Sequence, residues 1–318
     1  MPTATANRIE LEYEIFGDDD AVPLLLIMGL GAQMISWDPQ FCLALADRGF
    51  RVIRYDNRDI GLSTKFEDTG VDVMAGILTA ITGGRPEAPY YLKDMADDAA
   101  GLLDFLGIPA AHVVGASMGG MIAQSLAIGH PDKVLTLTSI MSTTGDPGVG
   151  QADPEIAPLL LRPAASNRDD AIAAAIEGAQ LIESPEHFDL ERTTERATAA
   201  VDRMFYPQGV ARQLLAIVAS GSREADLARL DVPTLVIHGD MDRLVTPSGG
   251  ARTAEVIPGA ELLRLPTMGH DLPVVLWPQI IEAITQLAAS ANEGGAGVAK
   301  GAAVAASTPA SASASEGA

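Results

Sequence analysis

The hydrophobic and polar positions of this chain change their period several times along its length. Residues 9–16 alternate in polarity, as a strand or hairpin arm does when only one of its faces is buried. Residues 23–28 are instead apolar without a break, which is typical of a short strand covered on both faces. The pattern predicts strands over residues 9–16, 23–28, 51–55, 111–114, 134–140, 233–238 and 260–265.

The longer stretches between these strands are predicted to be helices. Residues 91–106, for example, end just before Gly107 and Pro109, which are residues that often terminate helices. Further helices are predicted over residues 41–48, 120–128, 171–182, 191–204, 210–220 and 278–289. Because strands alternate with helices, we expect an α/β fold with a mostly parallel central sheet and helices on both of its faces.

The alternation is interrupted once, over residues 142–225, where the pattern predicts helices and no buried strand. We expect this insert to form a helical cap (lid) over the site, and residues 1–141 and 226–290 to form the core. A shorter stretch, residues 70–89, is expected to add to the wall of the site. Residues 291–318 are mostly Ala, Ser and Gly, so a disordered low-complexity tail is expected there.

Composition narrows the possible classes of function. The chain has 318 residues, of which 47% are hydrophobic, so it can bury a sizeable core. Its net charge of -21 opposes binding to nucleic acids and to anionic membrane surfaces. The one cysteine, Cys42, cannot form an internal disulfide. Because no basic segment followed by an apolar one begins the sequence, we expect a soluble, cytoplasmic protein. We also expect a monomer or a small homo-oligomer.

The most specific chemical motif is Gly-Ala-Ser-Met-Gly at residues 115–119. It lies between a predicted strand and a predicted helix, and G-x-S-x-G in that setting is a nucleophile elbow. The sharp turn exposes the hydroxyl of Ser117. A serine alcohol is a weak nucleophile, so it needs a base to remove its proton and a carboxylate to orient that base.

A histidine and two carboxylates occupy suitable places for these roles. Asp240 and Asp242 lie in the loop after the predicted strand 233–238, and His270 follows the predicted strand 260–265 by a short loop. Because the carboxyl ends of parallel strands meet at one edge of a sheet, we expect these residues to lie near Ser117. His270 would act as general base, and either aspartate could hold its imidazole.

Two backbone N–H groups are expected to bind the oxyanion of a tetrahedral intermediate. One belongs to Met118, directly after the nucleophile, and the other to Leu30, in the Gly-Leu-Gly loop that follows residues 23–28. The sequence contains no H-E-x-x-H motif and no paired cysteines, and this loop is not a dinucleotide fingerprint because no third glycine opens a helix. The expected reaction therefore needs no cofactor and no metal.

Other polar residues near these motifs are expected to be structural. Asp56 and Arg58, just after residues 51–55, are predicted to pair with each other and to support the floor of the site. The other histidines lack matching partners and are expected to be structural: His112, His130, His187 and His238. Of these, His238 is expected to line the pocket that holds the triad carboxylate.

Together the motifs resemble those of the α/β-hydrolase fold superfamily, from residue 9 to residue 289. The order Ser, Asp, His is that of the family. The segment Met-Gly-His-Asp-Leu-Pro at residues 268–273 is similar to the bacterial serine esterase branch that contains aclacinomycin methylesterase. In that branch the aspartate three residues after the loop glycine is the triad acid, which implies Asp242 rather than Asp240. Many members have His-Gly in the oxyanion loop where this chain has Met28-Gly29, so its substrate preference is expected to differ.

The resemblance implies a carboxylic-ester hydrolase that works through an acyl-Ser117 intermediate on a small-molecule ester. The apolar cap favours a fairly hydrophobic substrate, such as a methyl ester or lactone of a natural product or a short acyl ester. The same triad would also serve a cofactor-free perhydrolase (haloperoxidase) or a carbon–carbon bond hydrolase. A non-catalytic ligand-binding protein on this fold is a third alternative, because fold alone does not fix function.

Overall fold

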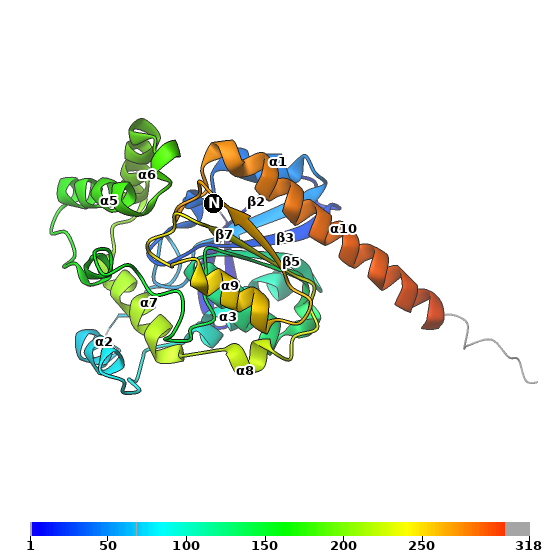
Figure 1. Cartoon of the computed structure of the whole chain (residues 1–318), viewed down its shortest axis with the longest axis horizontal. Helices are drawn as coiled ribbons and strands as arrows, with labels where there is room; N and C mark the ends of the chain where they lie inside the picture. The colour runs from blue at the N-terminus through cyan, green and yellow to red at the C-terminus, as the bar shows by residue number, and fades with distance from the viewer. Residues whose placement is uncertain (1, 68, 303–318) are drawn as a thin grey trace, which may run out of the picture.

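A computed structural model describes residues 2–67 and 69–302 of the chain (Figure 1). In this part of the chain eight strands form one sheet in the order β1-β2-β4-β3-β5-β6-β7-β8. Strands β1, β2 and β4 pair antiparallel, and the remaining pairs, from β4 to β8, are parallel. The strands are β1 (Thr3–Ala6), β2 (Ile9–Phe16), β3 (Val22–Ile27), β4 (Phe50–Tyr55), β5 (Ala111–Ala116), β6 (Val134–Ile140), β7 (Thr234–Gly239) and β8 (Glu261–Leu265).

Helices cover both faces of the sheet. One face packs against α1 and the first turns of α10, and the other packs against α3, α4, α8 and α9. Every residue of β5 is buried, as is typical of a central strand in a parallel sheet covered on both faces. The α/β fold with a mostly parallel sheet is therefore confirmed. The helices are α1 (Pro39–Ala46), α3 (Leu92–Phe105), α4 (Met118–Gly129), α8 (Glu224–Leu227), α9 (Ser248–Val256) and α10 (Trp277–Ala302).

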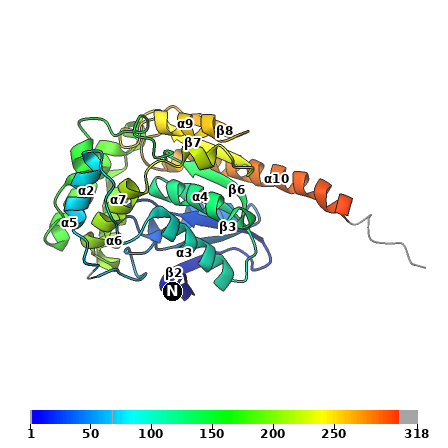
Figure 2. The ribbon, with the colours of Figure 1, turned by 90° about the horizontal axis from the view of Figure 1, so that it is seen from below.

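The segment between β6 and β7 is described throughout and contains helices but no strand. Figures 1 and 2 show α5, α6 and α7 grouped beyond one end of the sheet, with α2 beside them. Helix α2 packs on α7, where a Cβ on Gly76 would lie 2.9 Å from Leu215. The stretch 70–89 thus contacts the insert. These helices are α2 (Val73–Ile81), α5 (Arg168–Ile182), α6 (Leu190–Arg203) and α7 (Pro207–Ser220).

Local sequence explains where several helices begin. Asp38 caps α1, because its side chain accepts a hydrogen bond from the Gln40 N–H at 2.7 Å and Pro39 occupies the first helical position. Asp94 in the first turn of α3 accepts from the Tyr91 N–H at 2.8 Å. Short 3-10 helices complete the connections: η1 (Met34–Ser36), η2 (Pro131–Lys133), η3 (Ala157–Leu161), η4 (Pro185–His187) and η5 (Val274–Leu276).

Helix α10 differs from the expectation of a disordered tail that begins at residue 291. It continues to Ala302 and projects away from the sheet in Figure 1, whereas residues 303–318 lie outside the described part of the chain. Composition alone misses this extension, because lengthening an existing helix avoids the cost of nucleating a new one.

The stretch Val274–Ala291 is also long and apolar enough, by length and composition alone, to cross a membrane. Its side chains Ile280, Ile281 and Ile284 are buried in the core on one face of the sheet. Packing within the protein therefore accounts for the apolar residues of this inner face, while 22% of the whole stretch is buried.

Candidate active site

Ser117 lies at the turn between β5 and α4, with the backbone angles φ 56° and ψ -121°. A non-glycine residue adopts a positive φ only where its surroundings impose it. Gly115 and Gly119 allow the turn, since a Cβ on them would lie 2.1 Å from the Gly119 carbonyl oxygen and 2.0 Å from the Ile27 carbonyl oxygen, respectively. The Ser117 N–H donates to the Ile140 carbonyl at 2.9 Å. The strained serine is thus held between two neighbouring strands.

His270 lies between Ser117 and Asp242 and contacts both. Its Nε2 is 2.9 Å from Ser117 Oγ, and its Nδ1 is 2.8 Å from Asp242 Oδ2. A carboxylate only accepts, so Nδ1 carries the hydrogen and Nε2 is free to accept the serine proton. Asp240 instead pairs with Arg264 at the surface, with 2.7 Å between Oδ1 and Nε. The structure therefore brings Ser117, His270 and Asp242 together and leaves Asp240 outside.

Asp242 is almost fully buried, but its carboxyl group stays ionised. Burial alone would raise the pKa of its carboxyl, but the adjacent His270 and a nearby His238 outweigh burial and lower the pKa to about 2. Its Oδ1 also accepts from the backbone N–H groups of Leu244 and Val245, each at 2.9 Å. Asp242 therefore stays ionised at any pH near neutrality.

His238 lines the pocket of this carboxylate. Its Nε2 is 2.8 Å from the Val245 carbonyl oxygen and 3.5 Å from Asp242 Oδ2. Since a carbonyl only accepts, Nε2 of His238 carries the hydrogen. The side chain is 1% exposed, so it supports the loop that carries Asp242 and does not reach the cavity.

The loop that contains Leu30 lies against the nucleophile. A Cβ on Gly29 would be 3.1 Å from the Ser117 Cβ. Within the described residues no partner is found for the Leu30 N–H, and the Met118 N–H belongs to the first turn of α4, whose N–H groups have no acceptor within the helix. Both donors are thus available beside Ser117, where the helix end also favours negative charge.

A cavity of about 1270 Å³ separates this edge of the sheet from the insert, and Ser117 and His270 line it. Its other walls are mainly apolar and come from both core and insert, including Met28, Trp37, Met121, Met141, Leu214 and Trp277. Over the described ranges, 2–67 and 69–302, no group of three or more His, Cys, Asp or Glu residues is arranged to hold a metal ion.

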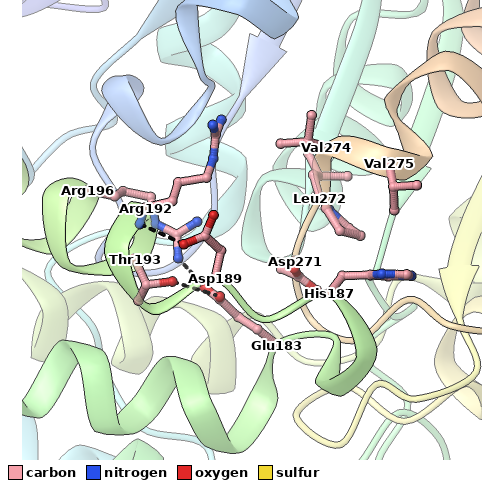
Figure 3. Close-up of a pocket in the computed structure, with 11 residues that line it drawn as sticks. Glu183, His187, Asp189, Arg192, Thr193, Arg196, Asp271, Leu272, Val274 and Val275 are labelled. Carbon is pink, nitrogen blue, oxygen red and sulfur yellow. Dashed lines mark hydrogen bonds and ion pairs between the residues drawn. The ribbon is translucent and has the colours of Figure 1, made fainter.

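A smaller pocket of about 240 Å³ adjoins this cavity (Figure 3). Figure 3 shows α6 and the residues after α5 on one side, and the segment 271–275 on the other. Two arginines of α6 are shared by the pocket and the cavity: Arg192 pairs with Asp38 and stacks over Trp277 at 5.3 Å, and Arg196 pairs with Glu183. The wall that the cavity shares with the smaller pocket is therefore charged, whereas most of its other walls are apolar.

The prediction that Asp56 and Arg58 pair with each other is wrong. Arg58 binds Asp98, with 2.6 Å between Nε and Oδ2, while Asp56 accepts from the Met34 N–H at 2.7 Å and forms an ion pair with Arg203 of α6 at 2.7 Å. Each residue therefore has a distant partner, and Asp56 joins the core to the insert.

The sequence patterns also missed Gln213 of α7, which is fully buried. Its Oε1 accepts from the Gly31 N–H at 2.9 Å, and its Nε2 donates to the Arg58 carbonyl at 2.8 Å. Gln213 follows the apolar Val210 by three residues, so the two side chains share one face of α7, and Val210 packs on Gly31. This spacing is the sequence signal that could have placed Gln213 on the inner face of the helix.

Comparisons with known proteins agree with this geometry. Residues 22–275 match the model of the family described as alpha/beta hydrolase fold. The chain is 32% identical over 313 residues to rhodomycin D methylesterase DauP of Streptomyces sp. (strain C5), covering 89% of this chain and 97% of that protein. It is 31% identical, with the same coverage, to rhodomycin D methylesterase DnrP of Streptomyces peucetius.

Among solved structures, the fold is similar to that of the meta-cleavage product hydrolase CumD of Pseudomonas fluorescens IP01, with a TM-score of 0.73. The alignment covers 92% of this chain and 98% of that chain. The two sequences are 19% identical, so this likeness concerns the fold alone.

Proposed function

The chain belongs to the α/β-hydrolase fold family and is a carboxylic-ester hydrolase, and we propose that Ser117 is its nucleophile, His270 its general base and Asp242 the carboxylate that orients His270. The observation that carries this proposal is the continuous hydrogen-bonded chain from Asp242 through His270 to the Ser117 hydroxyl. The strained backbone of Ser117 supports it as well, because such strain is concentrated at functional sites.

The reaction follows from these contacts. Ser117 Oγ attacks the ester carbonyl carbon while its proton passes to His270 Nε2, and the N–H groups of Leu30 and Met118 bind the resulting oxyanion. When the carbon–oxygen bond to the alcohol breaks, His270 returns the proton to the leaving alkoxide. Water then attacks the acyl-Ser117 carbonyl by the same route, which releases the carboxylic acid and restores the serine.

We propose a methyl ester of a bulky, mainly apolar molecule as the substrate. The cavity of about 1270 Å³ is larger than most small-molecule sites, and its apolar walls favour a hydrophobic body. The two relatives of Streptomyces are named as methylesterases of rhodomycin D. Arg192 and Arg196, which line both the cavity and the smaller pocket and are partly exposed, favour polar substituents on that side of the substrate.

The test compares the wild type with Ser117→Ala on 4-nitrophenyl acetate, butyrate and octanoate and on the methyl ester of a polycyclic aromatic acid. We expect kcat of the variant to fall by at least about a thousandfold on every ester, since the nucleophile is lost. The matched control is Ser125→Ala, two turns along α4, whose hydroxyl bonds only to the Met121 carbonyl.

Near wild-type turnover by Ser117→Ala would refute the role of this serine. The substrate proposal fails separately, if the wild type hydrolyses the short esters but prefers them to the polycyclic methyl ester.

The perhydrolase and carbon–carbon bond alternatives would use the same side chains, but no observation favours them over ester hydrolysis. The likeness to CumD extends to the fold and not to its substrate. The cytoplasmic location, the lack of nucleic-acid and membrane partners, and the monomeric or small oligomeric state stay predictions.

A further inference from the structure

The insert contacts the loop that carries His270 in two places. One is His187, whose Nε2 lies 2.9 Å from Thr267 Oγ1, and the other is the segment of residues 182–184, which begins at the last residue of α5. Four hydrogen bonds connect residues 182–184 to the loop. The His270 N–H donates to the Ile182 carbonyl at 2.7 Å, and the Gly269 N–H donates to Ser184 Oγ at 2.8 Å. Asp271 Oδ1 accepts from both the Ser184 N–H at 2.8 Å and the Ser184 hydroxyl at 2.5 Å. The residues before, at and after the histidine position are therefore all fixed by the insert.

The two segments are also in close contact. A Cβ on Gly269 would lie 2.6 Å from both the Glu183 carbonyl carbon and the Ser184 nitrogen, so only glycine allows this approach. Ser184 is fully buried in the contact. Figure 3 shows Asp271 on the side of the pocket that faces the segment after α5. The side chain of Asp271 thus binds the insert, while its neighbour His270 binds Ser117 and Asp242.

We propose that Ser184 and Asp271 act as positioning residues that hold His270 in register with Ser117, an inference that rests on the proposed triad. We call their contact the Ser184–Asp271 clamp. His270 must meet two partners at once, 2.9 Å and 2.8 Å away, from a loop that has no regular structure of its own. A displacement of about 1 Å in such a site can lower the rate roughly 100-fold.

The charged groups next to the clamp have partners of their own. Glu183, the neighbouring carboxylate, pairs with Arg196 and accepts from the Thr193 hydroxyl at 3.4 Å. Asp271 receives its hydrogen bonds from the neutral donors of Ser184. The insert therefore supplies part of the support for the catalytic histidine as well as a wall of the cavity, and it cannot lift away at this edge without moving His270.

The test measures kcat and KM for Ser184→Ala, Asp271→Ala, Asp271→Asn and the Ser184→Ala/Asp271→Ala double variant with 4-nitrophenyl butyrate. Loss of the clamp is expected to lower kcat about 10- to 100-fold with KM within about threefold of wild type, because the histidine shifts while the apolar walls of the cavity, which bind most of the substrate, are unchanged. Asp271→Asn retains an acceptor oxygen and is expected to recover most of the activity. The double variant should be no worse than the poorer single variant, since both residues serve one contact.

Glu186→Ala is the matched control, because it removes an exposed carboxylate two residues from Ser184. Thermal midpoints are recorded for every variant, and if Ser184→Ala does not fold, the half-buried Asp271 variants decide the question. The proposal is overturned if kcat is unchanged in Asp271→Ala, or if Asp271→Asn is as impaired as Asp271→Ala. Unchanged activity of Ser117→Ala would instead refute the triad, so the two failures are distinguishable.

Discussion

Asp240 and Asp242 are two residues apart, but their surroundings differ completely. Asp242 is 2% exposed and binds His270 and two backbone N–H groups, whereas Asp240 forms a surface pair with Arg264. Sequence spacing does not predict which of the two side chains turns inward in a loop, so the family resemblance was needed to prefer Asp242. The turn after β7 makes the difference, because it places Asp242 over the N–H groups that follow it.

Asp242→Asn is expected to lower kcat by roughly 10⁴-fold, because an amide leaves the imidazole in the wrong tautomer. The loss should be similar from pH 6 to pH 9, since the pKa of Asp242 is about 2 and the wild-type carboxylate is ionised throughout. Because this pKa lies below the ordinary 3.8, ionisation of Asp242 favours the folded state, and that contribution is lost only as the pH falls from about 4 towards 2.

The measurement is kcat across this pH range, with Asp240→Asn as the matched control. An Asp240→Asn variant that is as inactive as Asp242→Asn would contradict the assignment.

At the scale of elements, α7 holds the loop that carries the Leu30 N–H. Gln213 binds the Gly31 N–H and does not line the cavity. We therefore expect Gln213→Leu to lower kcat about tenfold with little change in KM. This effect is smaller than the approximately 3–4 kcal/mol typical of losing an oxyanion donor outright, since the donor itself remains. Steady-state kinetics test this, with the exposed Gln208→Leu on the same helix as control. An increase in KM with kcat unchanged would show that Gln213 serves binding instead.

The elements that the sequence predicts best are the ones that local patterns determine. The buried strands β3, β5 and β7 are short and mainly apolar, and their predicted bounds lie within two residues of those observed. Helix α9 was missed because it begins Ser-Gly-Gly, and glycine is a poor helix former. Strand β1 was missed because four small residues, Thr3–Ala6, acquire their structure only by pairing with β2.

At the scale of the whole molecule, the contacts that no local pattern predicts are those between core and insert. Asp56 and Arg203 are far apart in the sequence, as are Ser184 and Asp271, and each pair meets only when the insert folds over the sheet. The prediction paired Asp56 with Arg58 because they are neighbours in the sequence, whereas the true partner, Arg203, belongs to the insert. The triad was easier to locate, because its members follow strands whose ends a parallel sheet must bring to one edge.

One buried ion pair between core and insert joins Asp59, after β4, to Arg212 of α7. Two nearly parallel hydrogen bonds of 2.9 Å link the side chains, Asp59 is fully buried, and the side chain of Arg212 is 10% exposed. Removing one partner leaves a buried charge, so Arg212→Met is expected to lower the free energy of unfolding by about 3–5 kcal/mol. The Arg212→Met/Asp59→Asn double variant should be less destabilised than Arg212→Met alone, because the orphaned charge is removed as well.

Urea unfolding measures the stability of both variants. The control is Arg168→Met, which breaks an exposed ion pair and is expected to have little effect. If Arg212→Met is as stable as the wild type, this ion pair does not hold the insert to the core, and the other contacts, which include those of Asp56, Gln213 and Ser184, hold it instead.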